Sequence, residues 1–125
     1  MDTRSKILRP TEAIRLRGQP LILVTGYFDL LRPRHIRDLE DTRRVTPGCK
    51  LLVAVLPRAG EWMSQNARAE MAAALRVIDY VVIAENGDVE GLIERLRPKR
   101  VVRLEAAEER HAMQFSEQAR GREKS

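Results

Sequence analysis

Two uninterrupted apolar runs, at residues 21–25 and 51–56, constrain the fold of this chain more than any other feature. They read Leu-Ile-Leu-Val-Thr and Leu-Leu-Val-Ala-Val-Leu. A strand with one face in water alternates apolar and polar residues, whereas a strand covered on both faces does not. The runs therefore predict two strands of a parallel sheet, with residues 21–25 inside the sheet and not at its edge.

Helical patterns alternate with these runs and with two further strands. Pro33 suits the first turn of one helix, and the Asn86-Gly87-Asp88 turn can cap another. The elements predicted around the two runs are a short helix over 10–17, a helix from 33 to about 46, a helix over 67–76, a strand over 80–83, a helix between the 86–88 turn and Pro98, a strand over 100–103, and a terminal helix over 105–120. The helix over 67–76 is assigned an apolar face made of Met71, Ala74, Leu75 and Ile78, and the terminal helix is expected to bury Met113 and Phe115 in part.

This order of elements predicts an α/β fold. Strands separated by helices pair in parallel through right-handed crossovers. We expect a single-domain, doubly wound, Rossmann-like sheet of about four to five strands. The 125 residues divide into a lead-in helix over 1–20, an α/β core over 21–104, and a C-terminal helix and tail over 105–125.

Composition excludes several classes of protein. No apolar run approaches the roughly 20 residues of a membrane-spanning helix. The first residues lack a secretory signal, and the lone Cys49 cannot form an internal disulfide. We therefore expect a cytoplasmic protein without a membrane partner. The net charge of +5 comes from scattered arginines, and aromatic residues make up 4% of the chain, which disfavours a nucleic-acid partner and leaves phosphorylated small molecules.

The connection after the first apolar run, residues 25–35, carries the strongest signal for a ligand. Gly26 allows a sharp turn and a close approach of backbone to ligand. The helix that follows presents free amide groups at its N-terminus, where Arg32, Arg34 and His35 add positive charge. This pattern predicts an anion site at a strand-to-helix junction.

The same segment resembles the G-x-F-D-x-x-H-x-G-H signature of cytidylyltransferase-like nucleotidyltransferases. The resemblance is greatest to the ADP-heptose-forming domain of the bifunctional heptose kinase/adenylyltransferases, and it runs from about residue 6 to residue 103. It implies attack by a sugar or polyol phosphate on the α-phosphate of ATP or CTP, with pyrophosphate as leaving group. Magnesium would accompany the nucleotide, and no metal site on the protein itself is assigned.

The resemblance also implies roles for individual residues. His35 and Arg32 occupy the positions of the catalytic pair. The positions that bind nucleotide or phosphate are occupied by Thr25, Gly26, Tyr27, Phe28, Asp29 and Arg34. For Asp29 a helix-capping role is the alternative.

Four departures from the family pattern affect the expected activity. Arg32 replaces a histidine, Arg34 replaces a glycine, Leu56 ends a segment that is usually polar, and residues 105–109 replace a Lys-Gly-Gly-Asp-like turn. We expect a domain that binds a nucleotide or phosphate with weakened or lost catalysis. Two alternatives stay open: an active nucleotidyltransferase, and a structural or partner-binding module. A homodimer is one form that such partner binding would take. An Arg34 side chain directed to solvent would leave the nucleotide site open.

Overall fold

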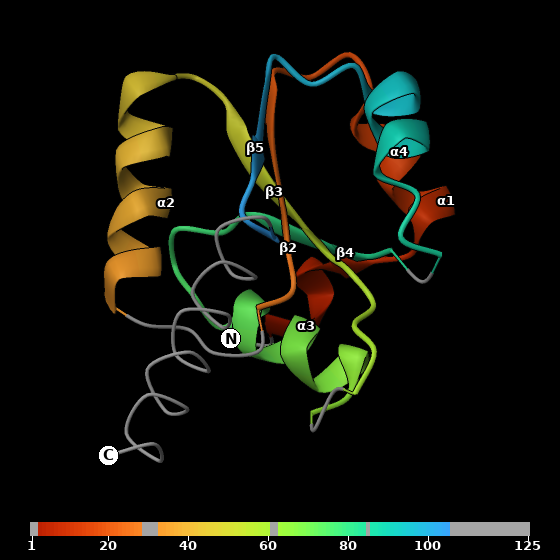
Figure 1. The fold of residues 1–125 in the computed structure, drawn as a ribbon. Helices are drawn as coiled ribbons and strands as arrows, with labels where there is room; N and C mark the ends of the chain where they lie inside the picture. The colour runs from red at the N-terminus through yellow and green to blue at the C-terminus, as the bar shows by residue number, and fades with distance from the viewer. Residues whose placement is uncertain (1–2, 29–32, 61–62, 85, 106–125) are drawn as a thin grey trace, which may run out of the picture.

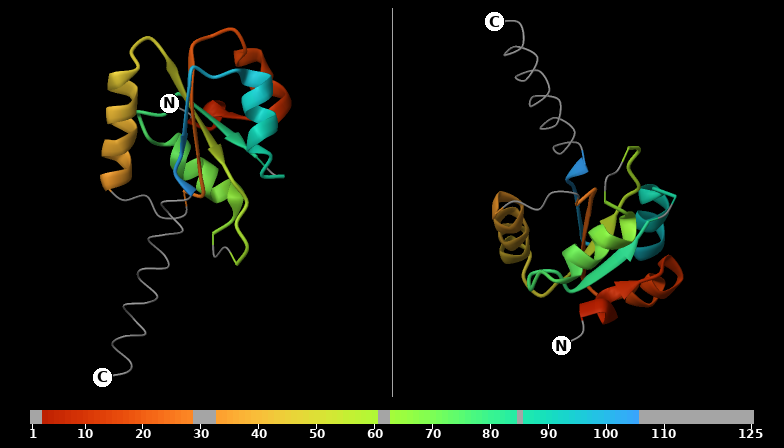
Figure 2. Two further views of the ribbon diagram at one scale, coloured as in Figure 1. Left: turned by 45° about the horizontal axis from the view of Figure 1, so that its top comes forward. Right: turned by 90° about the horizontal axis from the view of Figure 1, so that it is seen from below.

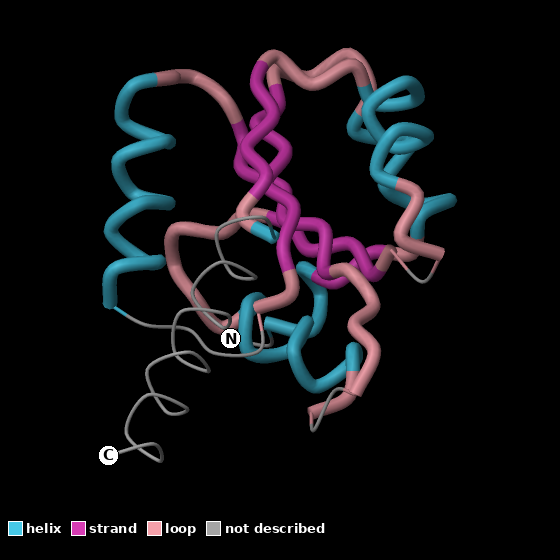
Figure 3. The backbone as a smooth tube through the Cα atoms, viewed as in Figure 1, coloured by secondary structure: helices cyan, strands magenta, loops and turns pink. Residues whose placement is uncertain are grey.

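The computed structural model describes residues 3–28, 33–60, 63–84 and 86–105, and these form an all-parallel five-stranded sheet (Figures 1 and 3). The strand order is β1-β4-β3-β2-β5. The strands are β1 (Ile7–Leu8), β2 (Leu21–Gly26), β3 (Lys50–Val55), β4 (Tyr80–Ile83) and β5 (Arg100–Arg103). The predicted α/β class is confirmed, as is the interior position of β2 between β3 and β5.

Helices cover both faces of this sheet (Figures 1 and 2). One face carries α2 (Pro33–Val45) and α3 (Gln65–Ala73), and the other carries α1 (Pro10–Ala13), the 3-10 turn η2 (Ile14–Leu16) and α4 (Val89–Leu96). A further 3-10 turn, η1 (Thr3–Lys6), precedes β1. Among the described helices, none combines the length and apolar character needed to cross a bilayer. The predicted terminal helix over 105–120 lies outside the described residues, except for its first residue.

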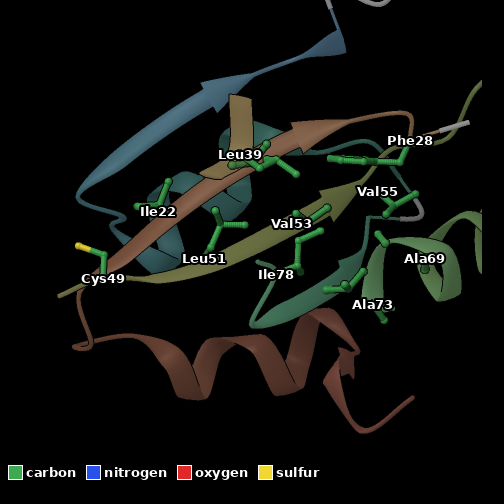
Figure 4. Packing of buried hydrophobic residues seen from close by; sticks show 13 residues of the cluster. Ile22, Phe28, Leu39, Cys49, Leu51, Val53, Val55, Ala69, Ala73 and Ile78 are labelled. Atoms are coloured by element: carbon green, nitrogen blue, oxygen red, sulfur yellow. The ribbon is translucent and has the colours of Figure 1, made fainter. Parts of the chain in front are cut away.

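The two faces of β2 explain its continuous apolar sequence. Ile22 and Val24 pack under α2 and α3, whereas Leu21 and Leu23 pack under α1 and α4. All four side chains are fully buried. Figure 4 shows the first of these layers, in which Leu39 of α2 lies against the sheet.

The structure corrects the predicted helix over 67–76. The helix begins at Gln65 because Ser64 caps it, accepting a hydrogen bond from the amide of Ala67 at 3.1 Å. Met71 and Ala74, expected on the buried face, are exposed. The buried face consists of Arg68, Ala69, Ala72 and Ala73. An alanine-rich helix has little contrast in side-chain size, so its contact with the sheet, and not its sequence, determines which alanines face inward.

The cap of α4 is confirmed. Asp88 is the N-cap residue, and its carboxylate accepts a hydrogen bond from the amide of Gly91 at 2.9 Å. A Cβ atom built on Gly91 would overlap this carboxylate. The glycine therefore leaves room for the cap.

This overlap predicts strong coupling between the two positions. Asp88→Ala should lower the free energy of unfolding by about 1 kcal/mol through loss of the cap. Gly91→Ala alone should change it little, because a gain of about 1 kcal/mol in helix propensity offsets the displaced cap. In the Asp88→Ala background the same change should stabilise by about 1 kcal/mol. Urea unfolding of the four proteins measures the coupling, and additive effects would contradict this account.

Candidate functional site

The carboxyl ends of β2 and β5 form the point where the strand order reverses. From β2 the chain moves outward through β3 to β4, and it then returns to pair β5 with the opposite side of β2. Open α/β sheets bind ligands outside the carboxyl ends of their strands at such a point. The connection after β2, which the sequence marks as an anion site, therefore begins where this architecture places a ligand.

The turn after β2 differs from the expectation in one detail. Gly26 continues the strand as its last residue, and its carbonyl accepts a hydrogen bond from the amide of Leu56 at 2.9 Å. The left-handed residue is Phe28, with φ of 54°. A non-glycine residue in this region costs about 1–2 kcal/mol. Burial of the Phe28 ring, which is 2% exposed and points toward Leu39, offsets that cost (Figure 4).

Arg68 fixes the connections that follow β2 and β3. Its side chain is fully buried, and Nη1 donates hydrogen bonds to the carbonyl oxygens of Tyr27 at 2.7 Å and Leu56 at 2.8 Å. Its Nε donates to the carbonyl oxygen of Met63 at 3.3 Å. A guanidinium suits this task because its donors form a rigid planar fork. One side chain from α3 thereby holds two connections at the carboxyl edge.

Two further contacts join the same edge. The Gln65 amide nitrogen donates to the carbonyl oxygens of Val55 at 2.9 Å and Ala84 at 3.1 Å, which ties β3 to the end of β4. The Arg58 guanidinium lies over the Tyr27 ring, with Cζ 4.6 Å from the ring centroid. This cation–π contact joins the connection after β3 to the connection after β2.

At the reversal point itself, a side-chain hydrogen bond joins β2 to the residues just beyond β5. The Thr25 hydroxyl donates to Oε2 of Glu105 at 2.7 Å, and Thr25 is fully buried. The backbone amide of Leu104 donates to the Thr25 carbonyl at 2.8 Å. The Glu105 carboxylate is therefore held in place beside the end of β2.

The structure describes six of the eight predicted site residues. Thr25, Gly26, Tyr27 and Phe28 form the end of β2 and the turn after it, and Arg34 and His35 lie in the first turn of α2. The Arg34 side chain is exposed, and His35 is half-buried. Asp29 and Arg32 lie outside the described residues.

Three of the residues that shape this edge were missed as site residues: Gln65, Arg68 and Glu105. Arg68 carried a signal, because it stands in an alanine-rich helix whose small side chains leave room for a long one to turn inward. Gln65 and Glu105 carried none, because their partners are 10 to 80 residues away in the sequence.

Comparison with known proteins finds relatives in sequence and a solved structure with the same fold. No family model matches the chain. It is similar to the bifunctional protein HldE of Nitrobacter hamburgensis, with 35% identity over 98 residues that cover 73% of this chain and 20% of that protein. It is also similar to the FAD synthase of Methanohalophilus mahii, with 31% identity over 85 residues that cover 65% of this chain and 60% of that enzyme. The chain thus spans about a fifth of the HldE protein and three fifths of the synthase.

A solved structure has the same fold. The lipopolysaccharide core biosynthesis protein from Thermoplasma volcanium superposes with a TM-score of 0.58 at 24% identity, covering 67% of this chain and 73% of that one. The parallel sheet and the reversal point define a Rossmann-like α/β protein. Homology to HldE and FAD synthase confirms the resemblance to the cytidylyltransferase-like family.

Proposed function

We propose that this chain is a nucleotidyltransferase-like domain that binds a nucleotide or another phosphorylated small molecule at the connection from β2 to α2, with weakened or lost catalysis. One observation carries the proposal: that connection begins at the reversal point of the sheet, on a carboxyl edge that hydrogen bonds from Thr25, Gln65 and Arg68 hold together. A rigid, preorganised edge binds a ligand without the cost of ordering it.

The charges at this edge support a phosphate as the ligand. The first turn of α2 offers amide groups and the positive end of a thirteen-residue helix. Arg34 and His35 stand in that turn. Because Arg34 is exposed, its guanidinium is accessible to a phosphate arriving from solvent.

The loss of catalysis is proposed from the residues that replace the family pattern. Arg32 cannot donate a proton near neutral pH in place of a histidine. Leu56 and Glu105 stand where polar and glycine-rich segments are expected, and losing one well-placed charge-stabilising donor typically costs about 100-fold or more in rate. Several such losses should leave no measurable turnover.

Magnesium would enter this site together with the nucleotide. Mg²⁺ keeps several water ligands and takes others from phosphate oxygens, and when bound it neutralises phosphate charge. Within the described ranges, no three metal-binding side chains come together. The protein's own part would be to hold the phosphates through the α2 amides and the Arg34 guanidinium.

The second candidate function is an active nucleotidyltransferase that moves AMP or CMP from ATP or CTP to a sugar or polyol phosphate. The exposure of Arg34 favours it, because the side chain that replaces the family glycine is accessible to solvent and not buried in the site. The relatives named FAD synthase also favour retained chemistry.

A pyrophosphate-release assay separates the two candidates. The protein would be incubated with Mg²⁺, with ATP or CTP, and with a panel of sugar and polyol phosphates. We expect no release above background. Release that disappears in His35→Ala and persists in Arg44→Ala would instead establish the active enzyme. Arg44 is the matched control because it lies near the other end of α2, about 14 Å from His35 along the helix axis.

Binding itself is tested by calorimetric titration with inorganic phosphate. Arg34→Ala should weaken phosphate binding about tenfold, the loss expected for one charge-assisted hydrogen bond of about 1.5 kcal/mol. Arg44→Ala should leave it unchanged. Equal affinities in all three proteins would place the phosphate elsewhere.

A further inference from the structure

Exposed cations gather at the amino edge of the sheet, on the side away from the candidate site. Three connections enter the sheet there: residues 17–20 before β2, residues 46–49 before β3 and residues 97–99 before β5. Figures 1 and 2 show the first and the last of these connections side by side. With the first residues of β3 and β5, these connections contain no carboxylate and carry five exposed cations, which we call the basic edge: Arg17, Lys50, Arg97, Lys99 and Arg100.

Backbone pairing fixes the spacing of the basic edge. The amide of Lys50 donates a hydrogen bond to the carbonyl oxygen of Pro20 at 3.0 Å, and the amide of Lys99 donates to that of Leu21 at 2.8 Å. β2 thus lies between the two lysines, with β3 on one side and β5 on the other. Because neighbouring strands are about 4.8 Å apart, the backbone positions of Lys50 and Lys99 are separated by about 10 Å. The sheet therefore holds these charges in a row before any ligand arrives.

The charge of the basic edge is not neutralised by the protein. Within the described ranges, no ion pair includes one of its five cations. Asp79 precedes β4 on the same side of the sheet, but its Oδ2 accepts the amide of Leu51 at 2.9 Å and lies 3.4 Å from Nη2 of Arg43. The dipole of α4 favours a cation at Arg97, its C-cap residue. It gives no such reason for Lys50, which begins a strand, so this charge remains for a partner in solution.

We propose that the basic edge binds double-stranded nucleic acid through its phosphate backbone, without reading the base sequence. In the sequence these cations stand in three distant segments, so their charge is scattered there and disfavours such a partner. The fold brings the segments into one row. A duplex carries one negative charge per about 1.7 Å of its axis, so a row of about 10 Å faces several phosphates. Guanidinium groups suit phosphate oxygens because they donate two parallel hydrogen bonds.

The chemistry of the edge favours a duplex over other anions. Single strands are bound largely by stacking of bases on aromatic rings, and the basic edge contains no aromatic residue. Tyr80, the first residue of β4, is half-buried and packs against the core. Binding to a membrane surface uses large apolar side chains beside the cations, and the three connections expose none. A nucleotide complexed with Mg²⁺ lacks the condensed counterions whose release drives binding to a duplex, so it is not expected at this edge.

The test titrates fluorescently labelled DNA and RNA duplexes of one sequence with the full chain over a range of salt concentrations. Binding is followed by fluorescence anisotropy. For wild type, the logarithm of the association constant should fall with the logarithm of salt concentration with a slope of about −4, because each phosphate neutralised by one of the five cations contributes about −0.9. Lys50→Gln/Arg100→Gln should make this slope less steep by about 2 and should weaken binding about 100-fold near 50 mM salt.

The matched control is Arg9→Gln/Arg37→Gln, which removes the same charge from two exposed arginines away from the basic edge. Arg9 follows the carboxyl end of β1, and Arg37 lies in the first half of α2. The slope and the affinity for either duplex should stay close to those of wild type. Thermal unfolding of both double variants verifies that the fold is intact.

Four results would overturn the inference. Equal losses in the two double variants would assign duplex binding to net charge and not to the basic edge. Competition by millimolar Mg·ATP at constant ionic strength would place the duplex at the candidate site. Tighter binding to vesicles of phosphatidylserine and phosphatidylcholine than to either duplex would make a membrane surface the partner. Absence of binding to both duplexes at low salt would exclude nucleic acid altogether.

Discussion

Replacing Arg68 with methionine should lower the free energy of unfolding by about 3 kcal/mol, the largest loss we expect from a polar substitution. Methionine has a similar length, but it removes the donor to the carbonyl oxygen of Tyr27 and to the buried carbonyl oxygen of Leu56. A buried polar group that loses its partner costs about 1–3 kcal/mol. Urea unfolding followed by circular dichroism measures the loss.

The control for this prediction is Arg76→Met. Arg76 is an exposed arginine just beyond α3, and its replacement should change stability by no more than about 0.5 kcal/mol. Arg68→Lys should lie between wild type and Arg68→Met, because an ammonium cannot reproduce the planar fork. A loss for Arg68→Met no larger than that for Arg76→Met would show that Arg68 does not hold the edge together.

Leu39→Ala should cost about 3 kcal/mol and should loosen α2 from the sheet. Leu39 is 1% exposed and is the buried residue of α2, lying in the layer with Phe28 and Val55 (Figure 4). Truncating a buried leucine removes its transfer free energy and leaves a cavity, which together cost about 2–5 kcal/mol. Denaturant unfolding measures this loss.

Val45→Ala is the matched control on the same helix. Val45 is 63% exposed, so its truncation should be close to neutral. Because α2 carries Arg34 and His35, Leu39→Ala should also weaken phosphate binding, whereas Val45→Ala should not. Similar losses of stability in the two variants would contradict the packing described for α2.

The sequence predicts the sheet well because a strand that is buried on both faces has a continuous apolar sequence. The runs that became β2 and β3 lack polar alternation, and their side chains enter two separate apolar layers. β1 has no such apolar run, because it consists of two residues and is held in the sheet by the pairing of Ile7 and Leu8 with β4.

The predicted apolar face of the helix over 67–76 is wrong at Met71 and Ala74, which are exposed, whereas Ile78 is buried and Leu75 packs against the core. The error has a related reason, since alanines look alike on every side of a helix.

The candidate site likewise has features that local sequence patterns predict and features that only the folded chain reveals. Its predicted location follows from the alternation of strands and helices along the chain and from the charged turn at Arg34 and His35, both of which are local patterns. The contacts that hold it are not local: Arg68 reaches Tyr27 across 41 residues, and Thr25 reaches Glu105 across 80. A single sequence gives no signal for partners so far apart, so these contacts became visible only in the folded chain.

The central claim is that phosphate binds where β2 leads into α2. The most direct measurement is the change in backbone amide chemical shifts when ¹⁵N-labelled protein is titrated with Mg·ATP and Mg·CTP at millimolar concentrations. The account predicts that the largest changes fall at Gly26, Phe28 and the first turn of α2, while Lys50 and Lys99 at the opposite edge of the sheet do not move. Largest changes at that opposite edge, or none at the end of β2 and the start of α2, would contradict it.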